Sequence, residues 1–296
     1  MSKGLMPVIK ATAIEILSSP LTLLLLLAAL TLAVLAPAFH YHQFGEATRM
    51  ARDAGFSAIF TCGTAVAVFC TIQAFRSEIE SGTLQMALSH PISRASFFVS
   101  KMLGAFVAYF VFTSIVFFTS LTIIEGARIG GVIARQTGDI ARLHGPYFAA
   151  GVSIMLMPLI LGAMLNRFLR FRFVLSANII SFVLASLAVT VSSVFNYSLF
   201  SRYLPVAVLL MMPACVFVSA AAAFATRLPA NAAAASCGVL IALSVPSIGN
   251  YYMSNALSNG GVVSWSYVAM AAVAAAPALA AFIILGVWFM GKRDVS

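Results

Sequence analysis

Residues Arg76–Gly104 read RSEIESGTLQMALSHPISRASFFVSKMLG and form the densest polar stretch of an otherwise apolar chain. Five charged side chains fall between Arg76 and Lys101, and two of them are the closely spaced carboxylates Glu78 and Glu80. The apolar runs on either side reach about 20 residues, the length that a helix needs to cross a bilayer. The stretch is therefore predicted to connect two membrane spans, with the remaining chain as the membrane scaffold around it.

The first part of this stretch has the pattern of a short amphipathic helix. Ser81 or Thr83 can cap the first turn, because a side-chain oxygen there accepts from the free backbone amides. Glu78 and Glu80 would then lie near the positive end of the helix dipole, where negative charge is favoured. The apolar side chains that follow at helical spacing are Leu84, Ala87 and Leu88.

The second part contains a predicted break and the start of the next helix. Pro91 restricts the residue before it and ends the short helix. Ser93 is a second candidate cap, for a helix that carries Arg94 and Lys101 into the following span. Taken alone, these features also fit a solvated loop helix with ordinary caps.

The stretch resembles the signature of ABC-2 type permeases, the membrane subunits of ATP-driven exporters. The matching residues are Glu78, Glu80, Gly82, Thr83, Leu84, Leu88, Ser89, Pro91, Ile92, Ser93, Arg94, Lys101 and Gly104. The resemblance implies that residues 76–96 form a cytoplasmic coupling segment that docks into a groove on a separate ATPase subunit. The residues that it assigns to ATPase coupling are Arg76, Glu78, Glu80, Gly82, Thr83, Leu84, Leu88, Pro91 and Arg94.

The composition of the whole chain is that of an integral membrane protein. Of its 296 residues, 62% are hydrophobic and 8% are charged, far outside the range of soluble domains. The net charge of +9 comes from basic residues near the ends of apolar runs, which is typical of topology determinants and headgroup contacts, so no nucleic-acid partner is expected.

The apolar runs predict an all-α fold with about eight membrane spans, in a range of six to eight. The predicted spans are 20–39, 56–75, 97–124, 147–166, 173–197, 204–226, 231–251 and 265–290. Residues 1–19 are predicted to form an interfacial amphipathic helix rather than a signal peptide. The whole chain, residues 1–296, is predicted to be one permease domain. Permeases that the signature resembles mostly have six spans, so the expected count departs from that pattern.

Residues 125–146 are predicted to form a separate amphipathic segment outside the cytoplasm. Arg128, Arg135 and Arg142 recur every seven residues beside an apolar face. This spacing fits an interfacial helix whose arginines extend toward the headgroups. A site for an anionic substrate or partner is the alternative.

The chain offers weak candidates for metal or nucleotide binding. His40 and His42 form an H-x-H pair, but two histidines are too few for a closed metal site, and a plain interfacial loop is the other interpretation. Residues 286–293 have the spacing of a P-loop up to Lys292, yet Arg293 stands where magnesium binding needs Ser or Thr. We therefore expect no metal or cofactor on this chain, with ATP and Mg on the partner subunit.

The distribution of charge predicts topology and function class. More basic side chains fall on one side of the predicted spans, which puts both termini and residues 76–96 in the cytoplasm. The expected location is the inner (cytoplasmic) membrane of a bacterium. No Asp, Glu or His lies within the predicted spans, which disfavours proton coupling and intramembrane catalysis. The expected function is a non-enzymatic permease subunit of an ABC-2 exporter that pairs with a second permease subunit and contacts membrane lipids. A non-transporting scaffold or assembly factor and an ion-driven secondary transporter are the alternatives.

Overall fold

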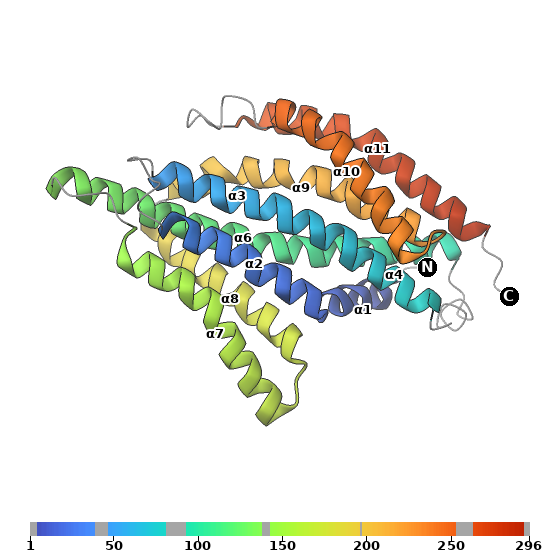
Figure 1. The fold of residues 1–296 in the computed structure, drawn as a ribbon, viewed down its shortest axis with the longest axis horizontal. Coiled ribbons are helices and arrows are strands. Elements are labelled where there is room, and N and C mark those ends of the chain that lie inside the picture. Colours follow the sequence, from blue (N-terminus) through green and yellow to red (C-terminus); the bar gives the residue numbers. More distant parts are fainter. Residues whose placement is uncertain are drawn as a thin grey trace. The chain divides into compact units, whose positions relative to one another are not determined.

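The computed structural model of the protein describes residues 5–38, 47–80, 93–137, 143–195, 197–252 and 263–292. All regular secondary structure in these ranges is helical, which confirms the predicted all-α class (Figure 1). The helices in chain order are α1 (Leu5–Leu17), α2 (Pro20–Leu35), η2 (Ala36–Ala38), α3 (Ala47–Ala65), η4 (Val66–Cys70), α4 (Thr71–Glu80), α6 (Arg94–Thr137), α7 (Gly145–Leu169), α8 (Phe173–Phe195), α9 (Tyr197–Ala225), α10 (Ala230–Tyr252) and α11 (Trp265–Gly291).

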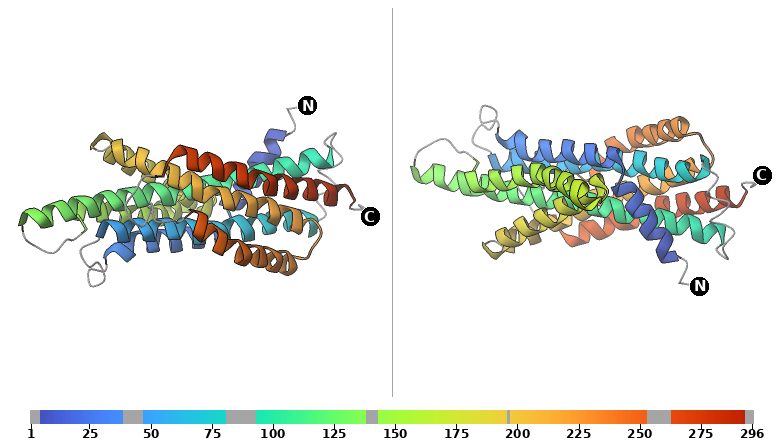
Figure 2. Two further views of the ribbon diagram at one scale, coloured as in Figure 1. Left: turned by 90° about the horizontal axis from the view of Figure 1, so that it is seen from above. Right: turned by 90° about the horizontal axis from the view of Figure 1, so that it is seen from below.

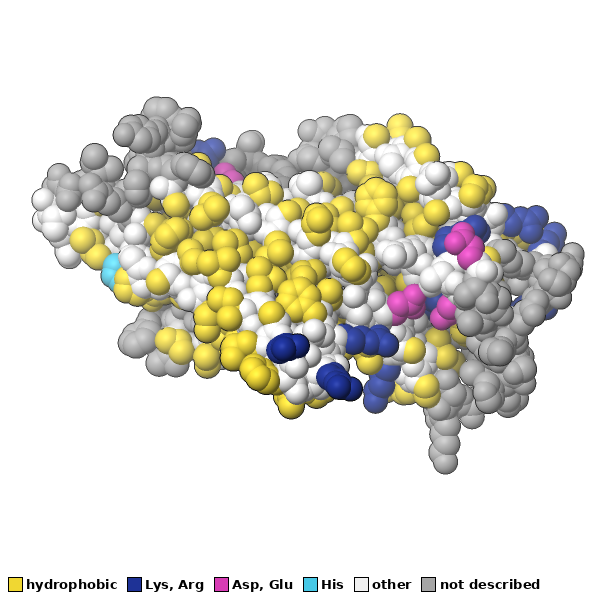
Figure 3. Space-filling view, turned by 60° about the horizontal axis from the view of Figure 1, so that its bottom comes forward, with side chains coloured by type: hydrophobic (Ala, Val, Ile, Leu, Met, Phe, Trp, Pro, Cys, Tyr) yellow, Lys and Arg dark blue, Asp and Glu magenta, His cyan; other side chains and the backbone are white. Residues whose placement is uncertain are grey.

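Seven helices of the described part are long and apolar enough to cross a membrane, which lies within the predicted range. The predicted eighth span, 231–251, corresponds to α10, whose described apolar part Ala230–Ser244 is shorter than the others. Figure 3 shows hydrophobic side chains over much of the face in view, and most of the charged side chains there lie toward its right and lower parts. Large apolar side chains exposed on this scale require a hydrocarbon environment, so the chain is a multi-pass membrane protein.

The third span differs from its prediction. Helix α6 continues without a break past the predicted span end at residue 124 to Thr137, and it carries Arg128 and Arg135. Its 44 residues give a length of about 66 Å at 1.5 Å per residue, roughly twice the thickness of the hydrocarbon core. The second span is also longer than expected, since α3, η4 and α4 form one rod from Ala47 to Glu80 with a π-helical turn at Val66–Cys70.

The chain divides into two compact units. Unit 1 comprises Met1–Leu17, Thr64–Phe110 and Met211–Ser296, and unit 2 comprises Ser18–Gly63 and Val111–Leu210. In unit 1, α1 packs against α4, and α10 packs against η4 and α4. In unit 2, α2 packs against α7 and α8. The α7–α8 hairpin slants away from α2 toward its closed end (Figure 1).

Candidate functional site

The described part of the predicted coupling site lies where α4 ends and α6 begins, in unit 1. Arg76, Glu78 and Glu80 occupy the last turns of α4, and Arg94 is the first residue of α6. Ser93 caps α6 as predicted, because its Oγ accepts a hydrogen bond from the Ser96 amide at 3.1 Å. The predicted site residues outside the described residues are Gly82, Thr83, Leu84, Leu88 and Pro91, and so are His40 and His42.

A buried ion pair connects the two helices on either side of residues 81–92. Lys101 Nζ of α6 lies 2.6 Å from Glu78 Oε2 of α4, and the lysine side chain is only 1% exposed. The ammonium group also lies over the Phe75 ring, 5.4 Å from its centroid. Lysine is almost never fully buried unless it is paired. The Glu78–Lys101 contact is therefore a specific structural link between the end of α4 and the start of α6.

The two acidic residues of α4 both lie in its last described turn. The short helix predicted to follow them lies outside the described residues. Each carboxylate has a cation nearby. Lys101 forms an ion pair with Glu78. Arg76 donates a hydrogen bond of 2.7 Å from Nη2 to Glu80 Oε1. Glu80 is 62% exposed and presents the accessible carboxylate of the site.

The N-terminal helix α1 lies against both of these helices. Ser77 Oγ of α4 donates a hydrogen bond of 2.7 Å to Glu15 Oε1 of α1. On α6, a Cβ atom at Gly104 would lie 2.7 Å from both the Ile9 carbonyl oxygen and Thr12 Cβ. Figure 2 shows α1, in dark blue, crossing the first part of α6. A glycine at position 104 is thus what allows α1 to lie directly on α6.

The effect of filling this contact provides the first prediction. Gly104→Ala is expected to displace α1 and to lower the free energy of unfolding by about 1 kcal/mol, because overpacking outweighs the gain in helix propensity. Gly238→Ala on α10 is the matched control, since a Cβ there meets nothing within 4 Å. It should stabilise the protein by up to about 1 kcal/mol. Thermal unfolding in detergent measures both, and equal shifts of the same sign would contradict the contact.

The C-terminal helix α11 closes the other side of the site. Arg94 Nη1 donates a hydrogen bond of 3.2 Å to the Gly291 carbonyl at the end of α11. Gly286 lies directly against the Phe98 ring, and a Cβ atom there would overlap ring carbons. The rings of Phe98 and Phe75 are 5.5 Å apart between centroids. Helices α1, α4, α6 and α11 therefore meet at the last described turn of α4 and the start of α6.

Sequence reasoning identified the exposed polar residues of this site and missed its buried contacts. The sequence places Lys101 in the signature and on the helix after Ser93 but assigns it no partner, and it does not mark Glu15 or Gly286 as coupling residues. The position of Lys101 near the start of a predicted span is the signal that could indicate its buried ion pair, because a charge inside a span normally has a partner. The described residues hold no group of three or more His, Cys, Asp or Glu side chains that could bind a metal.

The site consists of ion pairs and hydrogen bonds that join neighbouring helices. Glu78 pairs with Lys101 across two helices and Arg76 pairs with Glu80 within one, and the polar contacts connect α1, α4, α6 and α11. No curated protein and no solved structure matches the chain significantly. The family model described as ABC-2 family transporter protein matches residues 24–264, well over half of the 296 residues. This chain therefore belongs to the ABC-2 family of transporter proteins.

Proposed function

We propose that this chain is the permease subunit of an ABC-2 exporter and that residues 76–96 couple it to a separate ATPase subunit. The observation that carries the proposal is the Glu78–Lys101 pair between the two helices that flank residues 81–92. Each of these helices continues into a long apolar rod, Ala47–Glu80 and Arg94–Thr137. A displacement of the intervening segment would thus be passed to two spans at once.

The proposed mechanism is alternating access driven from the cytoplasm. Two permease subunits pair, and two ATPase subunits lie beneath them in a bacterial cytoplasmic membrane, with both permease termini on the ATPase side. ATP-driven closure of the ATPase dimer pushes on Glu78–Ser89. Arg76 and Glu80 make polar contacts with the ATPase, and Leu84 and Leu88 fill its groove. ATP hydrolysis belongs to the ATPase, and the substrate class that apolar spans favour is lipid-like or amphipathic.

Charge reversal at Glu80 tests the proposed contact. Glu80→Arg should reduce recovery of the ATPase with the tagged permease several-fold, because a charge exposed at an interface rim governs encounter with the partner. The measurement is affinity purification from native membranes in mild detergent, with quantification of every P-loop ATPase that copurifies. Transport should fall with it. Unchanged recovery and unchanged transport would contradict the coupling assignment.

A swap variant separates docking from local helix stability. Glu80→Arg also places two arginines at i, i+4, which destabilises α4 by a few tenths of a kcal/mol. Arg76→Glu/Glu80→Arg restores an ion pair within the helix while the charges stay reversed toward the partner. If docking requires the carboxylate at position 80, the swap variant recovers no more ATPase than the single variant. Full recovery with the swap variant would attribute the loss to the helix itself.

The identity of the copurifying proteins distinguishes the proposal from its alternatives. A scaffold or assembly factor would be recovered with non-ATPase partners or alone. A secondary transporter would move its substrate along an ion gradient and would remain active in vesicles without ATP. Transport that requires internal ATP and a copurified ATPase supports the exporter.

A further inference from the structure

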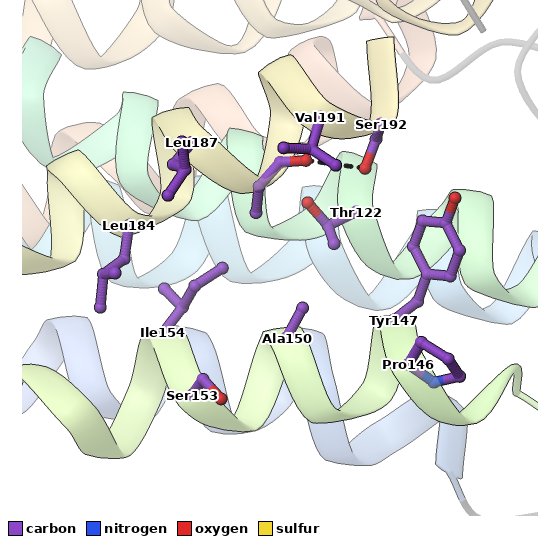
Figure 4. Close-up of a pocket in the computed structure, with 11 residues that line it drawn as sticks. Thr122, Pro146, Tyr147, Ala150, Ser153, Ile154, Leu184, Leu187, Val191 and Ser192 are labelled. Carbon is purple, nitrogen blue, oxygen red and sulfur yellow. Dashed lines mark hydrogen bonds between the residues drawn. The ribbon is translucent and has the colours of Figure 1, made fainter. Parts of the chain in front are cut away.

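Unit 2 contains a cavity of about 430 Å³ between α6, α7 and α8. Figure 4 shows α7 and α8 on opposite sides of it, with α6 behind. Tyr147 and Ser192 lie toward one end, and Ile154 and Leu184 lie toward the other (Figure 4). Leu187 and Val191 at the rim are more than half exposed, so the cavity opens onto the outer surface of the hairpin.

The cavity arises from the way in which α7 and α8 pack. Near their connecting turn the helices are in close contact, because a Cβ at Gly162 would lie 3.4 Å from Ala177 Cβ. Pro158 lies one turn farther from the connecting turn, toward the start of α7. It cannot donate the helix hydrogen bond that the Ile154 carbonyl would otherwise accept, and this favours a bend in the helix. Beyond it, small residues such as Ala150 and Ala188 leave space between the two helices.

The walls of the cavity favour a hydrocarbon occupant over water. Its hydroxyl groups already bond to their own helices: Thr122 to the Phe118 carbonyl, Ser153 to the Ala149 carbonyl and Ser192 to the Ala188 carbonyl. A bound water needs two to four polar partners, and these hydroxyls keep only acceptor capacity and are few along the walls of the cavity. The other lining side chains are apolar apart from the Tyr147 hydroxyl. Since α7 and α8 are candidate membrane spans with little of their surface buried within the chain, lipid chains can reach the opening.

One end of the cavity has the chemistry of a membrane interface. Tyr147 packs against Gly126 of α6, one residue from Glu125. Arg128 donates to Glu125 from Nε at 2.9 Å and from Nη2 at 2.6 Å, and 46% of its side chain remains exposed. Tyrosine and arginine with polar tips and apolar stems are typical of the headgroup level. The cavity thus runs from an interfacial end at Tyr147 to an apolar end at Ile154 and Leu184.

We propose that this cavity binds one acyl chain of a membrane phospholipid, with the headgroup at the Tyr147 end and the methyl end near Ile154 and Leu184. The site is formed by α6, α7 and α8 of a single chain and does not depend on the proposed ATPase coupling. A lipid chain there would fill the space between α7 and α8 and support a hairpin that contributes little buried surface of its own.

Photolabelling of the purified full chain in proteoliposomes tests this site. The vesicles are phosphatidylethanolamine and phosphatidylglycerol containing a phosphatidylglycerol with a diazirine either near the chain carboxyl or near the chain end. Mass spectrometry should locate the first label around Tyr147 and the second around Ile154 and Leu184. The reverse order, or labels spread evenly over all exposed apolar positions, would overturn the proposal.

A matched pair of variants distinguishes lipid binding in the cavity from lipid contact with the exposed surface of α7. Ala150→Phe fills the cavity, whereas Ala149→Phe adds the same ring on the exposed side of α7. Labelling at Ile154 and Leu184 should fall at least tenfold in Ala150→Phe, a difference of about 1.4 kcal/mol in binding free energy, and stay unchanged in Ala149→Phe. Ala188→Phe fills the cavity from α8 and repeats the test if the first variant does not purify. If Ile154 and Leu184 are labelled equally in Ala149→Phe and in the variants that fill the cavity, no specific site exists.

Discussion

Glu78→Ala is expected to lower the free energy of unfolding by about 3 kcal/mol, because it leaves the Lys101 ammonium buried without its ion-pair partner. Removing one member of a buried pair typically costs about 3–5 kcal/mol. The lower end applies here, since Glu78 is 30% exposed and the nearby Glu15 carboxylate also attracts Lys101. The midpoint of thermal unfolding in detergent should fall clearly, and less folded protein should be recovered from membranes.

Two control variants show whether the pair, rather than the glutamate alone, is responsible. Glu78→Leu/Lys101→Met removes both charges, and an apolar pair of similar size should restore most of the lost stability. Glu80→Ala in the same turn removes an exposed ion pair with Arg76 and should change the unfolding free energy by at most about 1 kcal/mol. If the double variant is as unstable as Glu78→Ala, the ion pair is not the cause.

The double variant also separates stability from transmission. A folded permease that still recovers the ATPase but no longer transports would mean that the Glu78–Lys101 link itself carries the movement of residues 81–92 into α6. Normal transport in the double variant would restrict the pair to a stabilising role. Both results leave the contact of Glu80 with the ATPase as a separate question.

Arg128→Ala has the second largest expected effect, a loss of about 2 kcal/mol in the free energy of unfolding. The Glu125 side chain is only 2% exposed, so removal of its arginine leaves a buried carboxylate without its cation. The expected loss is smaller than for Glu78→Ala because Arg128 is partly exposed and keeps much of its hydration in the folded state. The same thermal unfolding assay measures it.

Variants on the same helix test the cause of this loss. Glu125→Gln/Arg128→Ala removes both charges and should recover most of the stability lost in the single variant. Arg135→Ala is the matched control two turns away, at an exposed position, and should change the unfolding free energy by no more than about 0.5 kcal/mol. A loss in Arg135→Ala as large as in Arg128→Ala would point to a general effect of basic charge on α6.

The sequence predicted the helical class and most helix positions well because both depend on local properties. A backbone in hydrocarbon must bond to itself, so each long apolar run had to be a helix. The last predicted span, 265–290, and α11 (Trp265–Gly291) agree to within a residue. The cap at Ser93 was equally local, because donor and acceptor lie three residues apart.

The continuation of α6 past residue 124 could not be predicted in the same way. Glu125 and Arg128 look like the end of a span when each is counted as a charge. In the structure they pair at i, i+3 within the helix, so the helix carries both as one neutralised unit. Hydropathy counts residues one at a time and does not register such pairing.

The sequence by itself determined that this protein is a multi-pass helical membrane protein and that its polar signature lies between two long spans. Only the tertiary structure decided that Lys101 is buried against Glu78 and that α1 packs against Gly104. The same holds for the cavity between α6, α7 and α8. The physical reason is that helix formation depends on neighbours within a few residues. Burial, ion pairing and empty space depend on which distant side chains the fold brings together.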